Sequence, residues 1–458
     1  MIINESRNAT ANPPISKAWR QERITLSHAQ IKNVINNFKN PFFFDSGLNK
    51  PNGRYDILCA EPENTQKVSK TETLPSIYSS NTINLTTSEQ VTIPEKYQNL
   101  PFVCGWLGFS SYEFGAKLAI EPCQLLQSSS LPSLYIARYT WSYVYDHKLE
   151  QGYLTFSPQC DQTLEDKIQA LIKVVNSETK PEQRNTPKYA LLFKKSIRYD
   201  EYRQKFNLAK RYIKDGDCYQ VNLAQRFEAP FKDSPLALYF ELREKTNTPY
   251  SGYFSLGPNQ NILCFSPEKF IGIHNRLVES KPIKGTIENN HDEHRSDELR
   301  NSIKDKAENL MIVDLLRNDL SKICKLDSVK VEKLFKLETF NNVHHLVSHI
   351  KGALKDGVGE LEAFFSCFPG GSITGAPKKR AMEIINELEI SGRDAYCGSV
   401  FYLNDNGNFD SNILIRTIVH SEDKLFCWGG GAITDDSKVE EEYLESLIKV
   451  KNITNIEN

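Results

Sequence analysis

The chain has 458 residues, a net charge of −2, and 58 acidic against 56 basic residues. A chain of this length can bury a large core, either as two lobes or as one α/β body. Its lysines and arginines form no stripe interleaved with aromatic residues, which argues against a nucleic-acid partner. It has no apolar leader and no apolar run of about eighteen residues, so we expect neither a secretory signal nor a membrane span.

The ten cysteines are scattered along the chain without a CxxC pair. Most have apolar neighbours, as Cys264 has in the run ILCF. A zinc site would need paired spacing, so we interpret the cysteines as reduced core residues of a cytoplasmic protein.

The first half of the chain predicts mostly strands. The apolar runs 42–47 and 54–60 predict a hairpin, and the alternating run 132–145 predicts a strand that pairs with 151–156. The polar region 61–100 predicts surface strands and loops. In 164–175 the apolar residues recur at steps of three and four, which predicts a helix.

Residues 176–188 predict a linker, because they carry two prolines and mixed charges with almost no apolar residue. We place a functional boundary there, between an N-terminal part, 1–188, and a core, 189–458. After it, 199–214 and 236–245 predict helices.

Two further predicted helices carry acidic pairs. Asp305 and Glu308 open a run with helical apolar spacing, and Glu442 and Glu445 repeat their spacing near the C-terminus. Residues three positions apart on a helix project from nearly one face. Carboxylates so spaced suit Mg²⁺, and a solvated acidic helix face is the alternative for either pair.

Two glycine-rich segments and an arginine offer groups that could hold an anion. The loop 369–378 precedes a predicted helix, so its amides could hold a carboxylate or phosphate, or form a plain turn. The run 429–432 allows a close backbone approach or a flexible turn. Arg416 ends the predicted strand 413–415, where it could clamp a carboxylate or form a structural ion pair.

Lys284 lies in the stretch SKPIKGT. Pro282 fixes one backbone angle and Gly285 permits a tight approach, so we expect the lysine side chain at a defined place. Glu268 lies upstream and Asp305 downstream, which predicts an amine and acids around one pocket. A solvated surface lysine is the alternative.

Two adjacent histidines occupy a strand-like run. Because neighbours on a strand face opposite sides, we expect His344 in the core and His345 toward the pocket.

Taken together, four stretches resemble the chorismate-utilising enzymes: PIKGT (282–286), DKAENLMIVDLLRNDL (305–320), PGGSITGAPKKRAM (369–382) and the tail 429–445. The similarity extends from Tyr199 to the end of the chain. It is specifically to the branch that aminates chorismate at C4, because that branch has a lysine at the position of Lys284 where the anthranilate-forming branch usually has alanine.

The resemblance implies a fold and a reaction. The fold is a single interwoven α+β body of two large antiparallel sheets flanked by helices. In the reaction, Lys284 attacks C2 of chorismate, Glu268 assists loss of the C4 hydroxyl as a general acid, and ammonia adds at C4. The product is 4-amino-4-deoxychorismate, on the route to p-aminobenzoate and folate. No glutaminase signature is visible, so a glutamine amidotransferase partner would supply the ammonia.

The resemblance also implies ligand-binding residues. Mg²⁺ is held by Glu308 and Glu445, with Asp305 and Glu442 close by. The substrate contacts are Tyr396, Arg416, Gly430, Gly431, Ala432, Thr374 and His345. A tryptophan pocket, structural or regulatory, takes Asp45, Ser46, Arg54, Tyr55, Asp56, Pro249, Tyr250 and Ser251. The chain departs from its relatives in 287–290, which reads IENN where they often have a basic residue.

Two other functions fit the same residues. The first is formation of anthranilate from chorismate and ammonia, and the identity of the regioisomer separates it from amination at C4. The second is a non-catalytic tryptophan-binding protein on the same scaffold, which would bind tryptophan without turning over chorismate. The lysine and the acids argue against the second.

Overall fold

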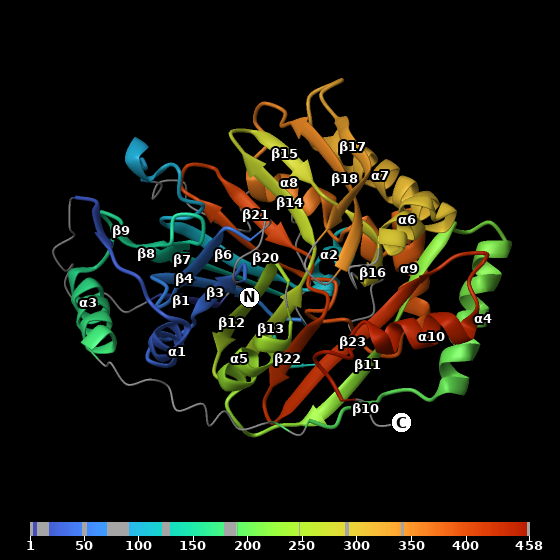
Figure 1. The fold of residues 1–458 in the computed structure, drawn as a ribbon, viewed down its shortest axis with the longest axis horizontal. Coiled ribbons are helices and arrows are strands. Elements are labelled where there is room, and N and C mark those ends of the chain that lie inside the picture. Colours follow the sequence, from blue (N-terminus) through green and yellow to red (C-terminus); the bar gives the residue numbers. More distant parts are fainter. Residues whose placement is uncertain are drawn as a thin grey trace.

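The computed structural model describes residues 3–6, 18–47, 53–70, 91–120, 129–177, 189, 191–246, 248–288, 293–339 and 343–455. They form two large antiparallel sheets with helices around them (Figure 1). The eleven-stranded sheet runs in the order β1 (Ile3–Ser6), β5 (Asn64–Val68), β7 (Leu134–Tyr139), β6 (Gly105–Ser110), β20 (Ser399–Asn404), β21 (Phe409–Asn412), β14 (Lys269–His274), β15 (Leu277–Ser280), β18 (Val343–Ala353) and β16 (Ile283–Glu288), and β17 (Lys330–Thr339) also pairs with β18.

The twelve-stranded sheet draws its strands from the whole chain as well. Its order is β10 (Lys194–Lys195), β11 (Gln220–Pro230), β23 (Lys424–Ile433), β22 (Thr417–Ser421), β13 (Gln260–Ser266), β12 (Tyr250–Gly257), β3 (Phe42–Asp45), β4 (Tyr55–Cys59), β8 (Trp141–Asp146), β9 (Gln151–Phe156) and β2 (Arg20–Arg23), and β19 (Gly375–Ala376) pairs with β11.

The helices cover the edges and outer faces of the sheets. They are α1 (His28–Asn36), α2 (Tyr112–Lys117), α3 (Gln162–Ser177), α4 (Tyr199–Lys214), α5 (Pro235–Lys245), α6 (Glu293–Asn301), α7 (Ile303–Ile323), α8 (Glu360–Cys367), α9 (Lys378–Leu388) and α10 (Val439–Ile448), with short 3₁₀ turns η2 (Glu95–Tyr97) and η3 (Gly371–Ile373). In Figure 1, β16, β18 and α7 lie above β23 and α10.

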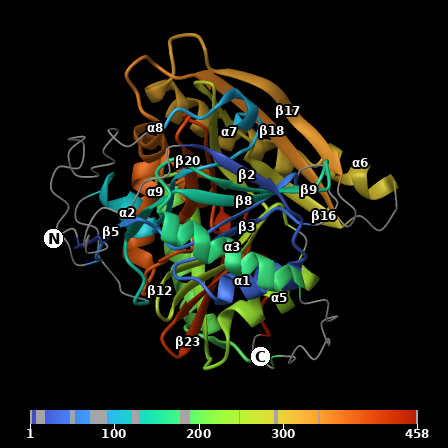
Figure 2. The same ribbon diagram turned by 90° about the vertical axis from the view of Figure 1, so that its left-hand side faces the viewer.

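Two apolar cores hold the layers together. Strand alternation divides neighbouring residues between them: Phe42 and Ile262 enter the larger core, which includes residues of both sheets, whereas Phe43 and Leu263 enter the smaller one. The smaller core lies between the twelve-stranded sheet and the helices α1, α3 and α5; Figure 2 shows α1 and α3 in front of this sheet.

Most predicted elements are present. The hairpin is β3 and β4, which pair antiparallel, and the predicted helices at 164–175, 199–214 and 236–245 are α3, α4 and α5. The expected α+β body of two packed antiparallel sheets is confirmed.

One predicted strand is two strands in different sheets. The run 132–145 breaks at Thr140, so that β7 belongs to the eleven-stranded sheet and β8 to the twelve-stranded sheet. Alternation continues through the break, which is why the sequence alone does not reveal it.

The predicted linker lies largely outside the described residues, since 178–188 are not among them, and the functional boundary at 188 stays a prediction. Nine cysteines are described, and all are buried free thiols. Among the helices that the structure describes, none is long and apolar enough to cross a membrane.

Candidate active site

A bulge in the eleven-stranded sheet sets the position of Lys284. The register between β16 and β18 shifts directly after this residue, and Gly285 has a φ of +74°. A bulge of this kind redirects the neighbouring side chains, and only glycine adopts this backbone without strain. A Cβ at Gly285 would lie 3.0 Å from Cγ of Asp305. Glycine therefore allows the N-terminal turn of α7 to approach the strand that carries Lys284.

Glu268 lies where the chain passes from β13 in one sheet to β14 in the other. Its backbone N–H donates to Oγ of Ser266 (3.1 Å), and its carbonyl accepts from the N–H of Ile413 (3.1 Å). Its side chain is buried and accepts a 3.1 Å hydrogen bond from Oγ of Ser372. The carboxyl group is thus held at the junction of the two sheets.

Burial shifts the pKa values of Lys284 and Glu268 in opposite directions. It raises the pKa of Glu268 to about 7, although the nearby Lys284 ammonium and the Ser372 hydrogen bond oppose the shift. It lowers the pKa of Lys284, although the negative charge of Glu308 opposes that shift. Both changes favour an uncharged amine beside a protonated carboxyl group, which is the state that a nucleophile and a general acid require.

One acid from each predicted acidic pair acts on this amine. Both Glu308 on α7 and Glu445 on α10 act electrostatically on Lys284. A Cβ at Gly431 would lie 2.7 Å from Oε2 of Glu442 and 3.6 Å from Oε1 of Glu445. The absence of a side chain at this position of β23 leaves room for the carboxylates of α10.

The site has the donors that a magnesium ion uses, but no complete protein cage. Among the described residues, no three His, Cys, Asp or Glu side chains lie close enough together to hold a metal. Mg²⁺ commonly takes only one or two protein carboxylates, with waters and anionic substrate oxygens as its other ligands. Glu308 and Glu445, whose charges act on one amine from two helices, fit that requirement.

Arg416 and His345 reach the same region from two sides. Residues 413–415 are not a strand, contrary to our prediction: they form the crossing from β21 to β22, which runs antiparallel beside the crossing that carries Glu268. Arg416 ends this crossing with a φ of +51°, and the charge of Glu268 acts on its guanidinium. Burial and Arg416 lower the pKa of His345 to about 4, so its ring is neutral at pH 7.

The glycine run 429–432 is part of strand β23 and not a turn. Opposite it on β11 the partners of Gly430, Gly431 and Ala432 are Ala224, Leu223 and Asn222. The Tyr396 ring stacks on Trp428 of the same strand, with centroids 6.3 Å apart and planes at 5°. The predicted substrate contacts Gly430, Gly431 and Ala432 therefore lie on β23, and Tyr396 packs against the same strand.

Thr374 differs from the other predicted contacts. It has no exposed surface, and its hydroxyl donates to the carbonyl of Gly370 at 3.0 Å. Its own carbonyl accepts from the N–H of Asn222 at 2.8 Å. In this structure Thr374 closes the glycine-rich loop and joins it to β11.

Sequence reasoning missed two residues of the site. Lys449 donates to the carbonyl of Gly430 (3.0 Å) and pairs with Glu445 (2.6 Å). Its spacing of four residues after Glu445 on a predicted helix was a usable signal. Ser372, which contacts Glu268, lies inside the glycine-rich loop, where no local pattern separates it from ordinary turn residues.

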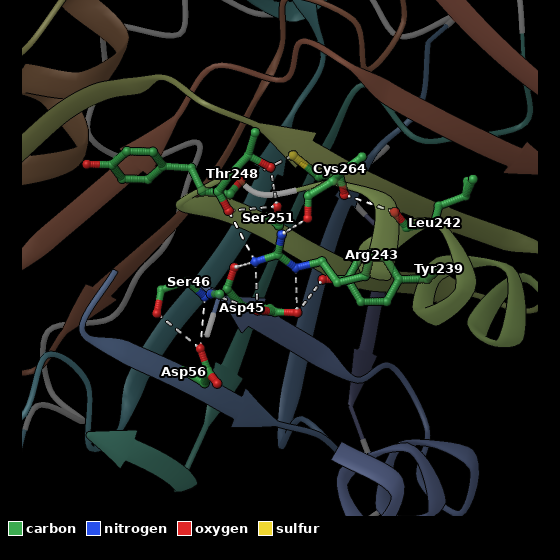
Figure 3. Close-up of polar contacts among 12 residues, drawn as sticks. Asp45, Ser46, Asp56, Tyr239, Leu242, Arg243, Thr248, Ser251 and Cys264 are labelled. Atoms are coloured by element: carbon green, nitrogen blue, oxygen red, sulfur yellow. Dashed lines mark hydrogen bonds and ion pairs between the residues drawn. The ribbon is translucent and has the colours of Figure 1, made fainter. Parts of the chain in front are cut away.

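Four of the residues predicted to bind tryptophan lie in a separate polar cluster at β3, β4 and β12 (Figure 3): Asp45, Ser46, Asp56 and Ser251. Asp45 is buried and accepts four hydrogen bonds: from Nε and Nη2 of Arg243, from the Tyr239 hydroxyl and from the Gly47 N–H. Burial by itself would raise the pKa of Asp45, but the charge and hydrogen bonds of Arg243, together with His28 and Tyr239, outweigh burial and lower it.

The remaining members of the predicted pocket are only partly connected to Asp45. Asp56 accepts from the N–H and Oγ of Ser46, and Ser251 hydrogen-bonds Thr248, whose carbonyl accepts from Arg243. Arg54 instead pairs with Asp146 at 2.8 Å and stacks on Tyr55. Tyr250, which follows Pro249, accepts through its carbonyl from the Asn412 amide (3.2 Å), beside the crossing that leads to Arg416.

Comparison with known proteins identifies the family to which this chain belongs. The model of the chorismate binding enzyme family matches residues 41–455. The chain belongs to this family. Aminodeoxychorismate synthase component 1 of Salmonella typhimurium is 36% identical over 88% of this chain and 89% of its own length. Anthranilate synthase component 1 of Lactococcus lactis is 32% identical over 78% of this chain and 80% of its own.

Solved structures agree with the fold. The crystal structure of anthranilate synthase component I from Streptococcus pneumoniae superposes with a TM-score of 0.76 at 28% identity, covering 89% of this chain and 94% of that one.

Proposed function

We propose that this chain converts chorismate and ammonia to 4-amino-4-deoxychorismate, on the route to p-aminobenzoate and folate. The observation that carries the proposal is the amine of Lys284, placed by a bulge beside a buried carboxyl group, Glu268, whose pKa burial raises to about 7. The relatives named aminodeoxychorismate synthase component 1 support the same reaction.

The proposed chemistry has two steps. In the first, Nζ of Lys284 forms a bond to C2 of chorismate and becomes a cationic secondary amine, the two ring double bonds shift, and the C4–O bond breaks; the proton of Glu268 goes to the departing hydroxyl, which leaves as water. In the second, ammonia forms a bond to C4, the double bonds shift back, and the C2–Nζ bond breaks, which returns Lys284 as a neutral amine. The new ammonium group at C4 gives a proton to the Glu268 carboxylate, so that both groups regain their starting states. Arg416, the neutral His345, Tyr396 and the glycine strand would position the ring and its carboxylates.

Magnesium is part of the proposal. When bound, it would neutralise a substrate carboxylate and orient the ring. Glu308 and Glu445 would hold it, with Asp305 and Glu442 next to them.

Replacing either proposed ligand should change the metal requirement more than the fold. Glu308→Gln and Glu445→Gln remove a charge while keeping the shape, so we expect the Mg²⁺ concentration for half-maximal activity to rise at least about tenfold. Activity measured over a Mg²⁺ titration tests this, with the exposed Glu244→Gln on α5 as a control. Unchanged titrations in both variants would remove these residues from the metal site.

The proposed partner is a separate glutamine amidotransferase subunit. We expect the purified chain to form 4-amino-4-deoxychorismate from chorismate and ammonia, and to form none from glutamine until the partner is added. Chromatography of the products tests both points and also identifies the regioisomer. Anthranilate as the product would favour the anthranilate synthase alternative, and consumption of glutamine by the chain alone would contradict the need for a partner.

We place the reaction in the cytoplasm, where buried free thiols stay reduced.

Tryptophan at the Asp45 cluster stays a prediction of the family resemblance. Asp45 already accepts four hydrogen bonds, so the ammonium group of tryptophan would have to use other acceptors or displace Arg243. We therefore expect calorimetry to show weak binding, with a dissociation constant no tighter than about the micromolar range, and no competition with chorismate. Tight binding without any chorismate turnover would favour the non-catalytic alternative.

A further inference from the structure

We propose that Lys449 is a built-in counter-ion of the metal-free site, whose ammonium group holds Glu445 and must be displaced before a divalent cation can bind. The inference rests on the proposed function, because it takes Glu445 to be a ligand of the metal. The inference adds that the Lys449 ammonium group competes with the metal for Glu445, and so lowers the affinity of the site for the metal.

The geometry puts the ammonium group between two acceptors of the site. Nζ of Lys449 lies 2.6 Å from Oε1 of Glu445 and 3.0 Å from the carbonyl oxygen of Gly430. The same oxygen of Glu445 lies on the side of Gly431, where a Cβ would be 3.6 Å from it. The pair therefore occupies the space over β23 that faces the active site.

Lys449 also acts on the proposed reacting groups. Its positive charge lowers the pKa of both Lys284 and Glu268, after the larger effects of burial and nearer partners. Its ammonium group is thus part of the same charge cluster. A divalent cation that approached Glu445 would find its oxygen Oε1 already paired with this ammonium group.

The pair is weak enough to be displaced. Both side chains are partly open to water, with 46% of Glu445 and 43% of Lys449 exposed. Ion pairs between residues four apart at such exposure contribute little to stability, because water screens them and their long side chains lose freedom. A dication that also binds Glu308 can therefore compete with the lysine, at a modest loss of affinity.

Lys449→Met should consequently tighten metal binding in the absence of substrate. We expect the dissociation constant for Mn²⁺, measured from the EPR signal of the free ion in the full chain without chorismate, to fall about two- to fivefold. That change corresponds to about 0.4–1 kcal/mol at 1.4 kcal/mol per tenfold, the range of such pairs. Lys449→Arg, which keeps the pair, should leave the constant near that of the parent.

A double-mutant cycle with Glu445→Gln separates displacement from simple repulsion between cations. If Lys449 acts by holding Glu445, Lys449→Met gives no gain in the Glu445→Gln background. If Lys449→Met tightens Mn²⁺ binding equally in both backgrounds, repulsion between the cations explains the effect and the displacement proposal is wrong. If it tightens binding in neither background, the proposal is wrong as well. Lys438→Met is the matched control, because Lys438 pairs with Glu441 at the other end of α10.

Failure of the proposed metal site would look different. In that case Glu445→Gln would leave Mn²⁺ binding unchanged, whatever the effect of Lys449→Met. Circular dichroism of each variant tests whether it is folded, and substitutions of side chains as exposed as these two usually change stability little.

Discussion

Lys284→Ala is expected to lower the rate of 4-amino-4-deoxychorismate formation from chorismate and ammonia by at least about 10³-fold. Among the described residues Lys449 also acts on Glu268, but it hydrogen-bonds the Gly430 carbonyl and so does not replace the Lys284 amine at the bulge. Removing a covalent nucleophile typically leaves only the catalysis that comes from binding and electrostatic positioning. Single-turnover kinetics at saturating chorismate, Mg²⁺ and ammonia measure the loss.

Three comparisons make the result specific to nucleophilic attack. Lys284→Arg should fail as well, because a guanidinium group stays protonated and cannot attack. Lys281→Ala, in the same stretch, should keep near-parental activity. Chorismate should still bind to the Lys284→Ala variant in calorimetry. Product formation at the parental rate would exclude the covalent mechanism, and formation of anthranilate would mean that Lys284 directs regiochemistry.

The sequence could predict several residues of the candidate site because they lie in recognisable local patterns. Helical spacing predicted the runs that became α7 and α10, and with them the acids Glu308 and Glu445. Gly285, which permits a tight approach of the backbone, predicted a defined position for Lys284, and the structure shows a β-bulge there.

The parts that the sequence could not predict depend on how the sheets are connected. Thr140, residues 267–268 and residues 413–416 are points where the chain leaves one sheet for the other. Side-chain alternation is the same on both sides of such a crossing, so no periodicity marks it. Two of these crossings run side by side and carry Glu268 and Arg416, which is why their proximity appears only in three dimensions.

Glu268→Gln is expected to lower activity about 10²- to 10⁴-fold, the usual contribution of a general acid. The amide keeps the shape and can still accept a hydrogen bond from Ser372, but it has no proton to give to the departing hydroxyl. Glu268→Asp, which keeps the acid but withdraws it from the site, should retain more activity than the amide. Rates measured with ammonia as the nitrogen source test this without the partner.

The same variant should be more stable than the parent at neutral and alkaline pH, and this second measurement does not depend on activity. Burial raises the pKa of Glu268 from 4.5 to about 7 in the folded chain. Between those values the folded state binds more protons than the unfolded state, so the parent loses stability as pH rises through the window. Glutamine does not titrate and avoids this loss, which at about 1.36 kcal/mol per pKa unit reaches at most about 3.4 kcal/mol.

Urea unfolding of parent and Glu268→Gln at intervals from pH 5 to pH 8.5, without metal or chorismate, measures the difference. The stability gain should be small at pH 5, grow toward pH 7 and then level off, while the exposed Glu244→Gln shows no such trend. A gain that is equal at every pH would mean that the carboxyl group is not held protonated by burial. A loss at every pH would mean that Glu268 serves the fold through its charge, and its assignment as the general acid would lose its physical basis.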